Sequence, residues 1–231
     1  MLNKDTLTVS LKLFIITAVA ALCLAVANTV TAPVIARNAK AAENEAMREV
    51  LPDADDFKKS DFTEGDIPDG AKSGVHIEAL NVGLSGGSGI GYVVTAVSNA
   101  GYGGDIKVMV GLDNSLKVTH AKIMEASETA GLGANASKPS FIGQFDGKGG
   151  KLSVVKGKTE KDDEISAISG ATITSRAVTS CINAALELVT SKTEKGFDSD
   201  KTAAVNEKLE ETKKATDEQI NGGAAEGGGE Q

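Results

Sequence analysis

Residues 168–176 read Ile-Ser-Gly-Ala-Thr-Ile-Thr-Ser-Arg, and their small side chains and hydroxyls suit the binding of an anion. Apolar residues follow at three- and four-residue spacing, which predicts a helix that begins near Thr172 and buries one face. These apolar residues are Val178, Ile182, Ala185, Leu186 and Val189. The first turn of a helix has N–H groups without intrahelical acceptors and the positive end of the helix dipole. The run therefore predicts a phosphate site at the Thr172 hydroxyl.

Two further segments combine glycine with residues that suit contact with a flat ligand. Residues 128–133, Glu-Thr-Ala-Gly-Leu-Gly, allow the backbone to approach such a ligand closely while Leu132 covers one face. Residues 101–104, Gly-Tyr-Gly-Gly, offer the ring and hydroxyl of Tyr102. The alternatives are a plain surface turn at 128–133, core packing of Tyr102, and an ordinary helix N-cap at residues 168–176, where Ser and Thr are the usual residues.

These segments resemble the motifs of a flavoprotein family in which FMN is joined to the protein through a phosphoester on threonine. Residues 169–175 resemble the S(T)GAT-x-T-S motif of that family. Residues 128–133 resemble its Glu-Thr-Pro-Gly-Leu-Gly loop, with Ala130 in place of proline, and residues 101–104 resemble its Gly-Tyr-x-Gly turn. The family includes the G subunits of Rnf-type ferredoxin:NAD complexes and the C subunits of the related sodium-pumping quinone reductases.

The resemblance implies covalently bound FMN with its phosphate on Thr172, and Thr174 is the alternative attachment residue. The loop at 128–133 would border the isoalloxazine ring, while the backbone at Ala171 and Ile173 and the hydroxyl of Thr174 would orient the phosphate. The cofactor-binding residues that the resemblance implies are Tyr102, Glu128, Thr129, Gly131, Leu132, Ser169, Gly170, Ala171, Thr172, Ile173 and Thr174.

A flavin transferase installs FMN in proteins of this family, and an acidic residue three positions before the motif serine is often part of its recognition site. Ser166 occupies that position here, and the acidic residues 162–164 lie just upstream. The resemblance further implies an electron-transfer subunit of a membrane ion-translocating ferredoxin:NAD oxidoreductase, partnered by membrane and iron–sulfur subunits. The alternatives are the C-type subunit of a quinone reductase, a stand-alone extracellular flavoprotein, and a non-redox adaptor tethered to a membrane.

Charge and cysteine content argue against several other functions. The formal net charge is −8, and no cluster of Lys and Arg occurs, which argues against a nucleic-acid partner. Cys23 and Cys181 are the only cysteines, and they have neither a disulfide framework nor metal-ligand spacing. His76 and His120 lie far apart in the sequence and near no acidic or cysteine cluster. We therefore expect neither a metal site nor a catalytic residue.

The N-terminal region contains an apolar segment long enough to cross a membrane. No charged residue occurs between Lys12 and Arg37, and a hydrocarbon core needs about 20 residues of helix. A cleaved secretory signal is the alternative, because residues 25–27, Ala-Val-Ala, have the small-x-small form of a cleavage site. The uncharged run continues past residue 27, which favours an anchor. We expect a single-pass protein of the cell membrane with its soluble domain on the extracytoplasmic side.

The remaining pattern predicts an α+β fold, an antiparallel sheet flanked by helices, after one N-terminal transmembrane helix. Alternating apolar residues between glycine- and asparagine-rich turns predict strands over 75–80, 92–97, 106–112, 116–124 and 152–156. Residues 113–115 are expected to join two strands as a short hairpin. The glycine-rich residues 86–91 match no nucleotide-binding fingerprint and are also expected to form a hairpin connection.

The chain is expected to have four parts. They are a cytoplasmic stub and transmembrane anchor (1–36), a juxtamembrane helix and lead-in (37–72), an FMN-binding domain (73–192) and an acidic, glycine-rich flexible tail (193–231). Within the second part, residues 39–51 have helical composition and end before Pro52, while the turn-rich residues 53–70 predict a loop. The tail is poor in large apolar residues and is expected to contain at most a weak helix over 203–220.

Overall fold

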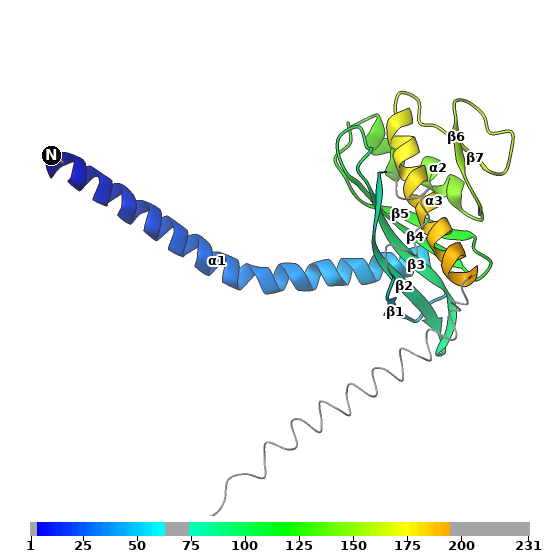
Figure 1. Cartoon of the computed structure of the whole chain (residues 1–231), viewed down its shortest axis with the longest axis horizontal. Coiled ribbons are helices and arrows are strands. Elements are labelled where there is room, and N and C mark those ends of the chain that lie inside the picture. The colour runs from blue at the N-terminus through cyan, green and yellow to red at the C-terminus, as the bar shows by residue number, and fades with distance from the viewer. Residues whose placement is uncertain (1–3, 63–73, 195–231) are drawn as a thin grey trace, which may run out of the picture. The chain divides into compact units, whose positions relative to one another are not determined.

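The computed structural model describes residues 4–62 and 74–194 of the 231-residue chain (Figure 1). The expected flexible tail and its weak helix lie almost wholly outside the described residues. The chain divides into two compact units between Glu45 and Ala46. The helices and strands are α1 (Lys4–Val50), β1 (Asp56–Ser60), β2 (Val75–Ser85), β3 (Ser88–Ser98), β4 (Ile106–Asp113), β5 (Val118–Ala126), η2 (Gly133–Ser137), α2 (Pro139–Ile142), η3 (Gly143–Phe145), β6 (Ser153–Val155), β7 (Glu164–Ser166) and α3 (Thr172–Glu194).

Five antiparallel strands form the main sheet of the second unit, in the order β1-β2-β3-β4-β5. The predicted α+β architecture is confirmed, and so are the five predicted strands, which are β2 to β5 of this sheet and the separate strand β6. Gly86 and Gly87 have φ angles of 57° and 88° in the turn between β2 and β3, which explains the glycines there without a nucleotide. Leu116 has a φ of 58° in the turn between β4 and β5.

The predicted loop at 53–70 is wrong in part, because β1 pairs with β2 along the edge of the sheet. The sequence of β1, Asp-Phe-Lys-Lys-Ser, lacks the alternation of a half-buried strand. Charged residues are common on edge strands because they discourage pairing with other chains. Strand β7 was also not predicted, and it pairs with β6 in parallel rather than antiparallel orientation. The two strands that were not predicted, β1 and β7, are short, so neither carries a hydrophobic period that a sequence pattern could detect.

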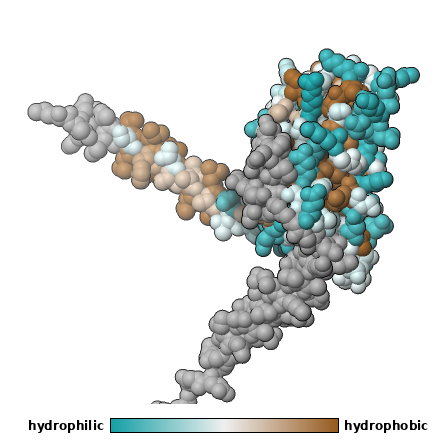
Figure 2. Space-filling model, turned by 45° about the vertical axis from the view of Figure 1, so that its right-hand side comes forward, coloured by the Kyte–Doolittle hydropathy of each residue, from teal (hydrophilic) through white to brown (hydrophobic). Residues whose placement is uncertain are grey.

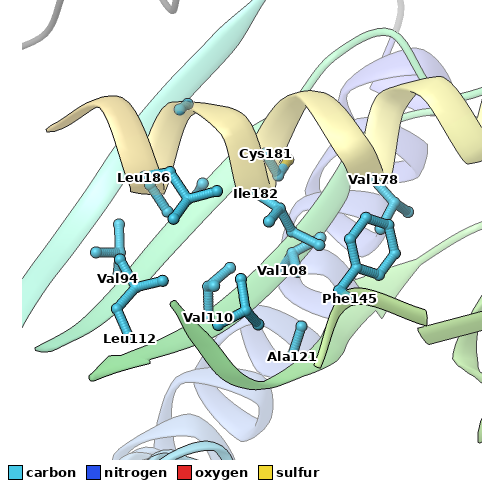
Figure 3. Packing of buried hydrophobic residues seen from close by; sticks show 14 of the residues in the cluster. Val94, Val108, Val110, Leu112, Ala121, Phe145, Val178, Cys181, Ile182 and Leu186 are labelled. Carbon is cyan, nitrogen blue, oxygen red and sulfur yellow. The ribbon is translucent and has the colours of Figure 1, made fainter. Parts of the chain in front are cut away.

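Helix α3 covers one face of the sheet, and the main core lies between them (Figure 3). Ile182 and Leu186 of α3 point towards Val108 and Val110 of β4, and all four side chains are buried. Phe145 of η3 is fully buried and makes an edge-to-face contact with Phe141, with ring centroids 5.6 Å apart. The apolar stripe predicted from residue spacing is thus the face that α3 buries against the sheet, which fixes the position of its first turn.

The other face of the sheet is covered by the C-terminal end of α1. Val50 and Leu51 form a second buried cluster with Val93 of β3 and Met109 of β4. Thr119 of β5 donates a hydrogen bond to the Val50 carbonyl oxygen. The helix expected at 39–51 is therefore the continuation of a single helix, and its last turns belong to the unit that contains the sheet.

Residues 8–45 of α1 are exposed along their whole length, including many large apolar side chains. Figure 2 shows these apolar residues along the N-terminal helix. Residues Thr8–Val50 include a window with a mean hydropathy of 2.4, enough to cross a membrane by length and composition. A signal sequence near an N-terminus can have a similar apolar segment, so the segment is consistent with a membrane anchor and with a cleaved signal.

Burial of Cys181 in the core of α3 leads to a prediction about thiol reactivity. Desolvation raises the pKa of this thiol from 9.0 to about 12, and its side chain is inaccessible. In a Cys23→Ser variant purified in detergent at pH 8, we expect Cys181 to resist iodoacetamide until guanidinium chloride unfolds the protein. Because the folded-state pKa is the higher one, deprotonation destabilises the fold only as the pH rises from 9 towards 12. Rapid labelling of the native protein would contradict this packing.

Candidate flavin site

A cavity of about 1300 Å³ lies beside the N-terminal end of α3, the yellow end in Figure 1. It is lined by residues from four separate stretches of the chain. The lining residues are Tyr102, Glu128, Thr129, Leu132, Gly133, Lys156, Gly157, Lys158, Thr159, Ser166, Ala167, Ile168, Ser169, Gly170, Ala171, Thr172, Ile173 and Thr174. Every residue expected to bind the cofactor is among them except Gly131.

The turn before α3 is held by the side chain of Ser175. Its Oγ accepts a hydrogen bond from the Ile168 N–H at 3.0 Å and donates one to the Ala171 carbonyl oxygen at 2.9 Å. The Ala171 N–H donates to the Ile168 carbonyl oxygen at 2.9 Å, so it is not available to a ligand. Gly170 has a φ of 76°, a conformation that side chains rarely adopt. These contacts explain the small residues of the motif and set the direction in which α3 begins.

Unpaired backbone donors remain at the beginning of α3. The N–H groups of Thr172, Ile173 and Thr174 have no hydrogen-bond acceptor within the described part of the chain. All three residues line the cavity, and the positive end of the helix dipole lies at the same place. The hydroxyl of Thr172 also has no hydrogen-bond partner among the described residues, and its side chain is half-buried. The first turn thus offers both donors for a phosphate and a nearby hydroxyl that could be esterified.

Thr174 differs from Thr172 because its hydroxyl is already engaged. Its side chain is only 1% exposed, and its Oγ1 donates to Glu128 Oε2 at 2.8 Å. The other carboxylate oxygen of Glu128 accepts a hydrogen bond from the Gly103 N–H at 3.1 Å. The expectation that the Thr174 hydroxyl orients a phosphate therefore has no support in the geometry, and Thr174 offers its N–H instead.

Two glycines are required around the Glu128 carboxylate because no side chain fits there. A Cβ at Gly133 would collide with Glu128 Oε2, and it would also lie 2.7 Å from Thr174 Oγ1. A Cβ at Gly103 would collide with the carbonyl oxygen of Ser127. The Gly-Tyr-Gly-Gly turn, the loop after β5 and the first turn of α3 are therefore in close contact through one carboxylate.

Three apolar side chains at the cavity are unusually exposed. Tyr102 is 70% exposed, Leu132 45% and Ile173 52%, and outside α1 they are the only exposed large apolar side chains in the described part of the chain. All three line the cavity. Core packing of Tyr102 is thereby excluded. Exposed apolar groups beside free backbone donors suit a ligand with a flat apolar ring and a phosphate, so the residues present fit FMN.

Sequence reasoning missed the loop at 156–159, which brings Lys156 and Lys158 to the cavity. The loop is held by Ser166, whose Oγ donates to the Gly157 carbonyl oxygen and whose N–H donates to Gln144 Oε1 at 2.8 Å. The sequence gives no signal for this loop, because it depends on the pairing of the short strands β6 and β7. Gly131, which was expected in the site, has a φ of 81°, and its carbonyl oxygen accepts a hydrogen bond from Asn135.

Comparisons with known proteins agree with this geometry. A family model described as an FMN-binding domain matches residues 101–187. The chain is 38% identical over 191 residues to the G subunit of the Na⁺-translocating ferredoxin:NAD⁺ oxidoreductase complex of Acetobacterium woodii, covering 80% of this chain and 92% of that protein. It is 41% identical over 165 residues to the G subunit of the proton-translocating ferredoxin:NAD⁺ oxidoreductase complex of Clostridium ljungdahlii, covering 71% and 80%.

Solved structures similar to this chain include the C subunit of the Na⁺-translocating NADH-quinone reductase of Parabacteroides distasonis, which is 28% identical with a TM-score of 0.42. The match covers 49% of this chain and 61% of that one.

The crowding at Gly133 gives a testable prediction about the loop after β5. We expect Gly133→Ala to lower the free energy of unfolding by about 1–3 kcal/mol, because the added methyl group must displace the Glu128 carboxylate or the Thr174 hydroxyl. Gly143→Ala is the matched control, since Gly143 has a φ of −69° and open space around it. Urea unfolding of the full chain in detergent measures both. Equal stability of the two variants would contradict the described contacts.

Proposed function

We propose that this chain is the FMN-carrying electron-transfer subunit of an ion-translocating ferredoxin:NAD⁺ oxidoreductase complex. The chain belongs to the family of G subunits of such complexes. The observation that carries the proposal is the first turn of α3, where unpaired N–H groups and the Thr172 hydroxyl meet exposed apolar side chains. Other subunits of the complex are its partners. The relatives favour this assignment over a non-redox adaptor and over a stand-alone flavoprotein.

Covalent attachment of FMN at Thr172 is the finer part of the proposal. Two threonines of the motif could in principle be esterified, but they differ in accessibility. Thr172 lines the cavity with its hydroxyl unpaired, whereas Thr174 is buried and donates to Glu128. A nucleophilic oxygen must be able to reach the phosphorus of a donor held by a flavin transferase, so the geometry favours Thr172. The N–H groups of Ile173 and Thr174 would then hold the phosphate oxygens.

The remaining residues of the cavity bind and orient the ring. Leu132 and Ile173 provide apolar contact, and Tyr102 provides a further aromatic surface at the rim. When bound, FMN supplies the electron chemistry, while the chain supplies burial, orientation and local charge. No side chain of the site needs to act as an acid, a base or a nucleophile in electron transfer itself.

The proposed location is the cell membrane, with α1 as a single span and the sheet-containing unit on the extracytoplasmic side. The long apolar helix supports the span. Covalent attachment of FMN at Thr172 suits the extracytoplasmic side, because a flavin that dissociated there would be difficult to replace where free FMN is scarce. In this arrangement the FMN-binding domain includes the end of α1, since residues from Ala46 onward pack with the sheet.

Attachment at Thr172 is tested by comparing two valine variants after coexpression with a flavin transferase. We expect Thr172→Val to abolish the fluorescence of the denatured protein under ultraviolet light, because the ester oxygen is absent. Thr174→Val is the control, and we expect it to keep the flavin even though it loses the hydrogen bond to Glu128. Mass spectrometry of the tryptic peptide 162–176 locates the modification. A flavin that persists in Thr172→Val and disappears in Thr174→Val would move the attachment to Thr174.

A further inference from the structure

The cavity is lined by charged side chains of opposite sign that come from different loops. Glu128 follows β5, whereas Lys156 and Lys158 lie between β6 and β7. All other residues that line the cavity are uncharged. None of the three charged side chains forms an ion pair within the described part of the chain. Their charges therefore act on whatever group the cavity holds.

The charge of Glu128 is fixed in position by neutral groups. Its two carboxylate oxygens accept hydrogen bonds from the Thr174 hydroxyl and the Gly103 N–H, at 2.8 Å and 3.1 Å. Its side chain is half-buried, so water screens the negative charge less than at the surface. Hydrogen bonds from uncharged donors do not neutralise it. The Glu128 carboxylate thus lies beside the first turn of α3, and no cationic side chain is paired with it in the described part of the chain.

The two lysines lie on an exposed loop whose backbone is nevertheless held. Ser166 Oγ donates to the Gly157 carbonyl oxygen, between the two lysines in the sequence. Both lysine side chains are exposed, so solvent and salt screen their charges more than that of Glu128. We therefore expect Lys156 and Lys158 to have a smaller electrostatic effect than Glu128 on a group bound in the cavity.

Reduction of a flavin changes the charge within the cavity. Two-electron reduction at neutral pH takes up two electrons and one proton, FMN + 2e⁻ + H⁺ → FMNH⁻, so the bound group gains one negative charge. A nearby negative charge opposes this change, and a nearby positive charge favours it. We propose that Glu128 lowers the midpoint potential of the bound flavin and that Lys156 and Lys158 raise it. The inference rests on the proposed function, because it requires that FMN occupies this cavity.

Charge-neutralising variants of the full chain, matured with a flavin transferase and kept in detergent, test the proposal. Glu128→Gln keeps both hydrogen bonds, because its amide oxygen can accept from Gly103 and its NH₂ group can donate to Thr174 Oγ1. The lysine variant is Lys156→Met with Lys158→Met. Matched controls are Glu125→Gln and the double variant Lys138→Met with Lys151→Met, which remove the same numbers of charges outside the residues that line the cavity.

Reductive titration with dithionite and a reference dye measures the midpoint potential of each variant. We expect Glu128→Gln to favour the reduced flavin about tenfold, which is about 30 mV for a two-electron couple. The lysine variant is expected to disfavour it about threefold, or about 15 mV, and the effect should decrease with added salt. Opposite signs are the critical result, because a general loosening of the site would shift both variants in the same direction.

Two controls separate the possible failures. Thermal unfolding of the flavin-free proteins checks that the variants are folded, and we expect no large loss for either. The mass of peptide 162–176 reports whether each variant carries flavin. Loaded variants whose potentials do not differ from those of the controls, or shift in the same direction, would overturn this inference alone. A wild-type protein that never binds flavin after coexpression with the transferase would overturn both this inference and the proposed function.

Discussion

The site depends on the hydrogen bonds that the Glu128 carboxylate accepts. The carboxylate accepts hydrogen bonds from the Thr174 hydroxyl and from the Gly103 N–H, and thereby joins three segments that no single element of secondary structure connects. Glycine is needed at two positions near it, because a Cβ at Gly133 would collide with the carboxylate and a Cβ at Gly103 would collide with the Ser127 carbonyl oxygen. By occupying the hydroxyl of Thr174, the same carboxylate leaves Thr172 as the threonine of the 169–175 motif whose hydroxyl has no partner among the described residues.

The sheet provides the rigid support for this arrangement. One face packs on α3, whose buried stripe determines where the first turn and its unpaired N–H groups lie. The other face packs on the last turns of α1, so the helix that is apolar enough to cross a membrane ends inside the folded unit. One face of the sheet thus positions the first turn of α3 beside the cavity, and the other face packs against residues at the end of α1.

Much of the fold could be predicted from the sequence, because the patterns that define its strands and helix are local, whereas the expected site residues came from the resemblance to a flavoprotein family. Alternating apolar residues defined β2 to β5, and the spacing after Thr172 defined α3. Strand β1 could not be predicted, since an edge strand with Lys58 and Lys59 has no hydrophobic period. Lys156 and Lys158 were missed for a different reason, because the loop that carries them reaches the cavity only through the pairing of β6 with β7. The hydrogen bond from Thr174 to Glu128 could not be predicted, because the two residues lie 46 positions apart in the sequence.

A crystal structure of the mature, flavin-loaded protein would show directly whether FMN is joined to Thr172. We expect continuous density from the flavin phosphate to Thr172 Oγ1, with phosphate oxygens within hydrogen-bond distance of the Ile173 and Thr174 N–H groups. We also expect that Glu128 still accepts hydrogen bonds from Thr174 and Gly103, and that Leu132 and Ile173 contact the ring. A phosphate joined to another residue, or a flavin bound away from the first turn of α3, would contradict this prediction.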